Sequence, residues 1–223
     1  MRSYVWPLLV AAFMAGADGQ YLTKAERKLK VNSLDCFHTY NESIYEYEFE
    51  TIDGQRNVSL GDYRNHTLLI LNALKQQFSN KLFEIIAFPC NQFGMQEPGG
   101  SGAEILNGIK YVRPGNGFEP NFLFSKKIDV NGDKEHPIYS YLKRSCPSTQ
   151  TEFSGRDRLF YDKLHVRDVR WNWEKFLIHP TSGQPIRRYD ASLEPHNIAT
   201  DIAKIALNRT TTGPINNAIQ TRL

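Results

Sequence analysis

The sequence is poor in cysteine and has no paired-cysteine motif. Cys36, Cys90 and Cys146 are the only three in 223 residues, and no two of them form a C-x-x-C pattern. A sparse, odd set excludes a disulfide-rich scaffold and leaves at least one thiol free. Without C-x-x-C, neither a zinc site nor a dithiol redox motif is supported. The six histidines are dispersed along the chain, so we expect no metal site.

Two further classes of protein are disfavoured by what is missing. The Lys and Arg residues are scattered and the net charge is only +3, so the sequence predicts no nucleic-acid partner. Beyond residue 19, no apolar run reaches the ~20 residues that a membrane-spanning helix needs, so we expect no membrane partner. No internal repeat or low-complexity block occurs, and the length fits one domain with appendages.

The first residues have the parts of a signal peptide. Arg2 precedes an apolar run over residues 4–15, and small residues follow at Ala17 and Gly19. The alternative, a membrane anchor, requires a longer run. We therefore predict a signal peptide over residues 1–19 and a secreted mature protein. Four N-x-S/T triplets agree with export and predict exposed, glycosylated positions. These are Asn41, Asn57, Asn65 and Asn208.

The hydrophobic pattern predicts an α/β fold. Apolar and acidic residues alternate over residues 44–50, and Asp53-Gly54 then predicts the turn of an N-terminal β-hairpin. Runs rich in branched and aromatic residues predict further strands, two of them a buried parallel pair. Helical spacing predicts helices between and after them. The expected strands are 56–60, 68–71, 82–88 and two around the turn at 180–183; the expected helices are 103–111, one near 138–142, and 194–207.

The predicted domain organisation follows from these elements. A mixed sheet flanked by helices would occupy residues 34–208. A Lys-rich arm precedes it over residues 20–33, and a polar tail over residues 209–223 is predicted to be disordered.

The connection between the two parallel strands is unusually short. Only residues 72–81 separate them, whereas a parallel pair needs a crossover of about a dozen residues or more, usually a helix with loops at both ends. The sequence therefore indicates that part of this crossover is missing.

Two segments carry the polar residues best suited to chemistry. The loop "FPCNQFGMQEP" follows a predicted strand and holds Gln96, an amide that can stabilise a reacting atom without changing charge. In "WNWEKF", Trp171 offers an indole N–H and Asn172 an amide. The alternatives are that the amides satisfy the backbone of an irregular loop and that Trp171 packs in the core.

Four segments in this order, "FPCNQFGMQEPG", "KYVRPGNGFEPNF", "KIDVNG" and "VRWNWEKFLI", resemble the glutathione peroxidase family, specifically its secreted, tetrameric plasma-type branch. The resemblance runs from about residue 36 to residue 207. It implies a thioredoxin-like fold, reduction of hydroperoxides in the response to oxidative stress, and no cofactor beyond glutathione as co-substrate. It also implies a catalytic cluster of Gln96, Trp171 and Asn172 around a cysteine or selenocysteine.

The resemblance also concerns partners. Arg113, Arg187 and Arg188 resemble positions that hold the carboxylates of glutathione, for which a guanidinium is well suited. For the last two, a solvated strand end is the alternative. The segment "ILNGIKYVRPG" lacks the resolving cysteine of thioredoxin-dependent relatives, which favours glutathione as reductant. The loop "PGNGFEPNF" resembles one that joins subunits, so a homotetramer is expected.

The nucleophile of the family is what this sequence lacks. Its loop would lie between Ile70 and Asn72, and no cysteine or selenocysteine stands there. Cys90 occupies a position that is not peroxidatic in the family and has no basic neighbour in sequence. Three interpretations stay open: a working peroxidase, a non-catalytic secreted glycoprotein that binds glutathione or another partner, and a transcript or gene model that omits a loop present in the native product.

Overall fold

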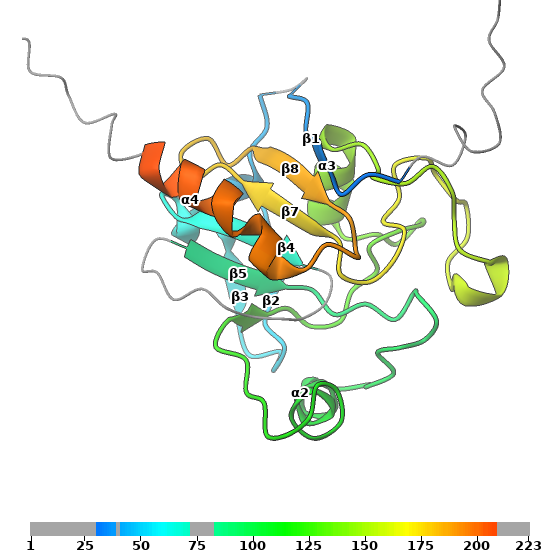
Figure 1. Cartoon of the computed structure of the whole chain (residues 1–223). Helices are drawn as coiled ribbons and strands as arrows, with labels where there is room; N and C mark the ends of the chain where they lie inside the picture. Colours follow the sequence, from blue (N-terminus) through cyan, green and yellow to red (C-terminus); the bar gives the residue numbers. More distant parts are fainter. Residues whose placement is uncertain (1–29, 39–40, 72–82, 209–223) are drawn as a thin grey trace, which may run out of the picture.

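A six-stranded mixed sheet forms the centre of the molecule, in the order β1-β8-β7-β4-β5-β6 (Figure 1). The computed structural model describes residues 30–38, 41–71 and 83–208. Strands β4, β5 and β6 are parallel, and β7 runs antiparallel to both β4 and β8. The predicted parallel pair is confirmed, with Leu69 opposite Ile85. The strands are β1 (Ser33–Asp35), β4 (Thr67–Leu71), β5 (Phe83–Ala87), β6 (Leu123–Phe124), β7 (Lys175–Ile178) and β8 (Pro185–Tyr189).

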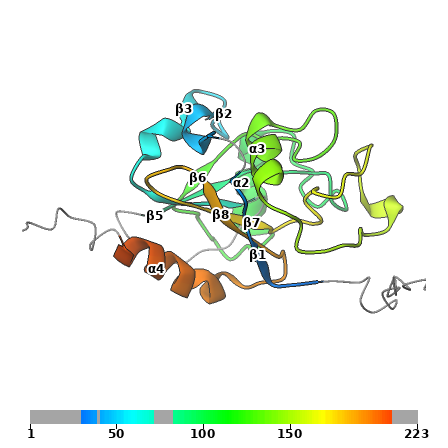
Figure 2. The ribbon, with the colours of Figure 1, turned by 90° about the horizontal axis from the view of Figure 1, so that it is seen from above.

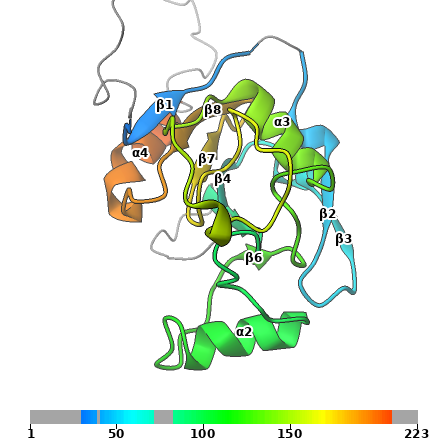
Figure 3. The same ribbon diagram turned by 90° about the vertical axis from the view of Figure 1, so that its right-hand side faces the viewer.

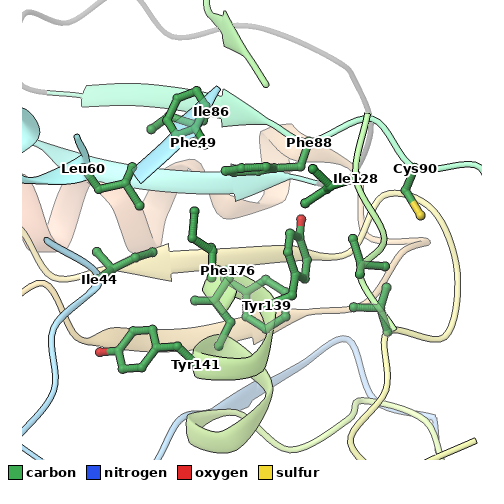
Figure 4. Close-up of a cluster of buried hydrophobic side chains, with 14 of the residues drawn as sticks. Ile44, Phe49, Leu60, Ile86, Phe88, Cys90, Ile128, Tyr139, Tyr141 and Phe176 are labelled. Atoms are coloured by element: carbon green, nitrogen blue, oxygen red, sulfur yellow. The ribbon is translucent and has the colours of Figure 1, made fainter. Parts of the chain in front are cut away.

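Helices cover both faces of this sheet (Figure 2). Because side chains alternate along a strand, Leu69 and Leu177 face one side, where they pack against Ile202 of α4 (Ala199–Asn208). The 3-10 turn Pro195–Ile198 leads into α4. On the other side, Phe176 packs with Tyr139 of α3 (Pro137–Ser145) and with the N-terminal hairpin (Figure 4). This larger cluster is the main core, and the mixed sheet flanked by helices is confirmed.

Helix α2 (Gly102–Tyr111) lies beyond the β6 edge of the sheet (Figure 3). It begins with a capping box, in which Ser101 accepts from the Glu104 N–H and the Glu104 carboxylate accepts from the Ser101 N–H. A Cβ at Gly102 would stand 2.0 Å from the carbonyl oxygen of Ile52, so only glycine permits this close approach. The helix is thereby fixed against the segment that follows β2.

The predicted N-terminal hairpin is confirmed, but its first strand is shorter than expected. Strand β2 (Glu48–Glu50) pairs with β3 (Asn57–Ser59), and the 3-10 turn Leu60–Tyr63 follows. Residues Ile44–Glu46 form a 3-10 turn instead of the predicted strand. The Ser43 hydroxyl accepts from the Tyr45 N–H, and Ile44 and Tyr45 are both buried although they are adjacent. A strand would have sent these two side chains to opposite faces.

A disulfide joins Cys36, just after β1, to Cys146 at the end of α3. The two Cα atoms lie 4.2 Å apart and the residues are 110 positions apart in the sequence. The prediction of a free thiol is confirmed, since Cys90 is unpaired and buried. The pairing itself was not predicted.

Several predictions fall on residues outside the described ranges. They concern the signal peptide over 1–19, most of the arm over 20–33, the short crossover over 72–81 and the tail over 209–223. Of the four glycosylation positions, Asn41, Asn57 and Asn65 are exposed, while Asn208 is the last residue of α4. None of the helices in the described ranges has the length and apolar character to cross a bilayer.

Candidate active site

A cavity of about 770 Å³ opens where β5 ends, between the loop over residues 88–99 and helix α2. This volume is within the range of roughly 300–1,000 Å³ that is usual for small-molecule sites. Its walls include Ala87, Ile105, Ile109 and Phe124, the same residues that anchor α2. The cavity therefore lies at the carboxyl ends of the parallel strands, where the sequence predicted chemistry.

Two of the three predicted catalytic residues meet in the wall of this cavity. The Asn172 side-chain amide donates a hydrogen bond of 3.0 Å to Oε1 of Gln96, although the residues are 76 positions apart. The sheet explains the meeting, because Leu71 pairs with both Ala87 and Lys175. The segment after β5 and the segment before β7 consequently reach the same edge.

The hydrogen bond fixes the orientation of the Gln96 amide. Its oxygen is occupied by Asn172, and its NH₂ group donates to no residue in the described ranges. Gln96 follows a left-handed turn at Gly94 and Met95, whose φ angles are 63° and 51°. Asn172 is buried whereas Gln96 is exposed, so a buried amide holds an exposed one in orientation and leaves its NH₂ group accessible.

Trp171 lies beside these two residues, although Trp173 and not Trp171 lines the cavity. It lies in the loop that precedes β7. Its ring packs on Phe93 with centroids 5.7 Å apart, and the Arg158 guanidinium lies 4.7 Å from the ring centroid. A Cβ at Gly94 would be 3.6 Å from both Trp171 and Arg158. Neither Trp173 nor Arg158 was predicted, since no local sequence pattern distinguishes them.

The three predicted glutathione-binding arginines occupy three different environments. Arg113 is exposed and lines the cavity. Arg187 does not line it and instead forms ion pairs with Asp35 of β1 and Asp201 of α4. Arg187 and Arg188 point to opposite sides of the sheet, because side chains alternate along a strand. Arg187 pairs with Leu177 and Arg188 with Phe176, and these two partners also face opposite sides.

The structure corrects the expectation for Arg188. Its side chain is fully buried, and its Nε donates at 2.6 Å to Glu174, which is also buried. The remaining nitrogens donate to the carbonyl oxygens of Cys146, Arg167 and Asp168. A guanidinium has five N–H donors. With four bonds made inside the protein and no exposed surface, Arg188 stabilises the core and offers no contact to a ligand.

Cys90, the remaining thiol, also lines the cavity but is only 2% exposed. Burial raises its pKa to about 12, so the thiol is protonated at neutral pH. The Gln92 N–H donates to its sulfur at 3.5 Å. The sequence predicted no peroxidatic residue, and the described residues place no ionised thiol in the cavity. They also contain no group of three or more His, Cys, Asp or Glu side chains that could hold a metal ion.

Known proteins are similar to this chain in sequence and fold. The family model for glutathione peroxidase matches residues 70–143. Glutathione peroxidase 3 of Hylobates lar is 40% identical over 210 residues, which cover 87% of this chain and 88% of that protein. Glutathione peroxidase 6 of Mus musculus is 38% identical over 228 residues, covering 95% of this chain and all of that protein. The crystal structure of T. cruzi GPX1 matches with a TM-score of 0.50 and 25% identity, over 74% of this chain and 96% of that one. The predicted thioredoxin-like fold is confirmed.

Proposed function

Since the chain belongs to the glutathione peroxidase family, we propose that it reduces hydroperoxides with glutathione outside the cell, in the response to oxidative stress. Two glutathione thiols supply two electrons and two protons, the peroxide O–O bond breaks, and the products are an alcohol, water and glutathione disulfide. The observation that carries the proposal is the hydrogen bond from Asn172 to Gln96 in the wall of a cavity that also holds Arg113.

Gln96, Asn172 and Arg113 each have a distinct role in this reaction. As the O–O bond breaks, negative charge develops on the leaving oxygen, and the NH₂ group of Gln96 can donate a hydrogen bond to it. Asn172 holds that group in orientation through the Gln96 oxygen. Arg113 can pair with a carboxylate of glutathione, since a guanidinium binds carboxylates in a bidentate manner.

The attacking thiolate is the part that Cys90 cannot supply, because its sulfur is buried and protonated. In our proposal the thiolate of a bound glutathione attacks the peroxide and becomes a sulfenic acid, and the peroxide leaves as an alcohol. The thiol of a second glutathione then displaces water from that sulfenic acid to give the disulfide. This order balances both electrons and atoms without a protein nucleophile.

A second candidate function is binding of glutathione without turnover. The burial and the raised pKa of Cys90 favour it, since no covalent intermediate can then form on the protein. The cavity, Arg113 and the amide pair would be the same in both cases.

We also propose that the protein is secreted, glycosylated and assembled as a homotetramer. The disulfide between Cys36 and Cys146 supports secretion, because such bonds persist in oxidising compartments. The exposed positions of Asn41, Asn57 and Asn65 support glycosylation. Assembly as a homotetramer is supported by Tyr111 and Val112, two large apolar residues that are exposed at the end of α2.

The test is turnover by the purified full chain with glutathione and an organic hydroperoxide, coupled to glutathione reductase. We expect turnover above the uncatalysed rate, reduced about 100-fold in Gln96→Ala, as for loss of one oriented donor. Cys90→Ser is the matched control and should retain the activity. Loss of activity in Cys90→Ser would make that thiol the nucleophile, whereas binding of glutathione with no turnover would leave the second candidate.

A further inference from the structure

Three charged side chains line the cavity, and two of them are uncommitted. Glu97, Glu104 and Arg113 contribute these charges. Glu104 is occupied, since one of its oxygens accepts from the N–H groups of Gly100 and Ser101. In the described part of the chain, the side chains of Glu97 and Arg113 make no hydrogen bond and no ion pair, either with other residues or with each other. Opposite charges thus share one cavity without neutralising one another.

The backbone around Glu97 is held firmly while its carboxylate stays available. Its N–H donates to Oδ1 of Asn91 at 3.0 Å. The Lys127 ammonium donates to the carbonyl oxygens of residues 97, 98 and 99, so it is occupied by the backbone and forms no ion pair with the Glu97 carboxylate. The carboxylate is partly buried, and this burial raises its pKa against the opposing fields of Lys127 and Arg113. A carboxylate in such a position is stabilised by an incoming cation.

From this arrangement we propose that Glu97 is a specificity-determining residue that binds the ammonium group of the γ-glutamyl end of glutathione, while Arg113 binds a carboxylate. The inference rests on the proposed function and deepens it. Glutathione carries one ammonium and two carboxylates at neutral pH, so a cavity with one free anion and one free cation complements it. A dicarboxylate without the ammonium would leave Glu97 unpaired beside like charge.

The same contact predicts a pH dependence of binding. The pKa of Glu97 is raised in the empty cavity and is lowered when an ammonium binds. Affinity is therefore full above the raised pKa and is lost as the pH falls through it, beginning above the ordinary glutamate value of about 4.3. The charged groups that act on Glu97 are Arg113 and Lys127, and the nearby Glu104 is held in its capping box.

The experiment compares two thioethers that cannot take part in redox chemistry. One is S-methylglutathione, and the other is its glutaryl analogue, which lacks only the ammonium. Titration calorimetry on the full chain should show about tenfold tighter binding of S-methylglutathione, as expected for one charge-assisted hydrogen bond. Glu97→Gln should bind both compounds equally. Glu119→Gln, which removes an exposed carboxylate from the neighbouring loop but not from the cavity, should keep the tenfold ratio.

The outcomes separate the two proposals. Binding of both thioethers with an unchanged ratio in Glu97→Gln overturns the inference alone. Binding of neither compound by the wild-type chain overturns the inference together with the proposed function. If Glu97→Gln does not fold, the wild-type pH series decides, since the affinity for S-methylglutathione should fall with pH and that for the glutaryl analogue should not.

Discussion

Arginine and glutamate pairs occur at both ends of the sheet, and they are organised in opposite ways. On the β8 side, Arg188 and Glu174 are buried and joined by a 2.6 Å ion pair. In the cavity, Arg113 and Glu97 form no ion pair with any residue that the structure describes. A buried charge must be neutralised by the protein, because isolation in a low-dielectric core is costly. A charge that is to bind a ligand must stay uncommitted, so the difference distinguishes a structural region from the proposed binding region.

Other groups on the β8 side follow the same rule. The buried Lys175 ammonium donates to the carbonyl oxygens of Asp190, Ala191 and Leu193. Asp190 in turn accepts from the side chains of Thr149, Gln150 and Ser192. This framework and the disulfide form the region that we call the frame, made of β1, β8, the start of β7 and the end of α3.

The largest effect is expected where a frame charge loses its partner. Arg188→Met should lower the free energy of unfolding by about 3–5 kcal/mol, because it leaves the Glu174 carboxylate buried and unpaired. Arg113→Met should change it by only about 0.5 kcal/mol or less, as for most exposed sites. Urea unfolding measures both. Adding Glu174→Gln to Arg188→Met should restore part of the loss, and equal losses in the two single variants would contradict the distinction between regions.

Removal of the disulfide should have the next largest effect. Replacing Cys36 and Cys146 together by serine should cost about 2–4 kcal/mol, since the bond closes a loop of 110 residues. The midpoint of urea unfolding would report the loss. Glutathione affinity should be unchanged under native conditions, because the bond lies in the frame. A parallel fall in affinity would show that the two regions are coupled.

A pH-dependent effect is expected at Lys175. Burial lowers its pKa to about 8, whereas the unfolded chain has an ordinary value of about 10.4. Between these values the unfolded state binds more protons than the folded state, so stability rises with pH in this window. Lys175→Met lacks this contribution. From pH 8 to 10, the unfolding free energy of the wild type should therefore increase relative to that of the variant. A constant difference between the two would contradict a lowered pKa of Lys175.

The smallest effect concerns the amide pair of the cavity. In a double-mutant cycle, Gln96→Ala and Asn172→Ala should show a coupling of about 0.5–1.5 kcal/mol in unfolding free energy, the usual net value of one hydrogen bond. Their effects on turnover should be far larger and strongly non-additive. Additive losses of activity would mean that Asn172 does not act through Gln96.

Patterns of period two and 3.6 were sufficient to predict most of the sheet and the helices. The segments that form β4 and β5 are apolar at nearly every position, so both faces of each strand must be buried. Strands of this composition are usually parallel, and the composition therefore predicted the pairing of β4 with β5. Residues 44–46 broke the rule, because a single hydroxyl at Ser43 offered the backbone an alternative partner. The alternation of apolar and acidic residues over 44–50 gave no sign that the Ser43 hydroxyl would bind the backbone.

The site was harder to predict than the fold. Gln96 and Asn172 were identified through family motifs, and the sheet register then explains why they meet. The sequence could not show which of the adjacent residues Arg187 and Arg188 is buried. That depends on which of them lies on the face of β8 that contacts Glu174. The disulfide pairing likewise depends on β1 lying next to the end of α3, two segments far apart in the chain.

The strand order also has a consequence for the order of events during synthesis. Strand β4 has β5 on one side and β7 on the other, and β1 is held in the sheet only by β8. Until residues 175–189 have been synthesised, β4 lacks its partner β7 and β1 lacks its partner β8. Open edges recruit strands from other chains. Nascent chains halted before residue 175 therefore lack both strands that close this side of the sheet, and we expect them to be more prone to aggregation than the finished chain.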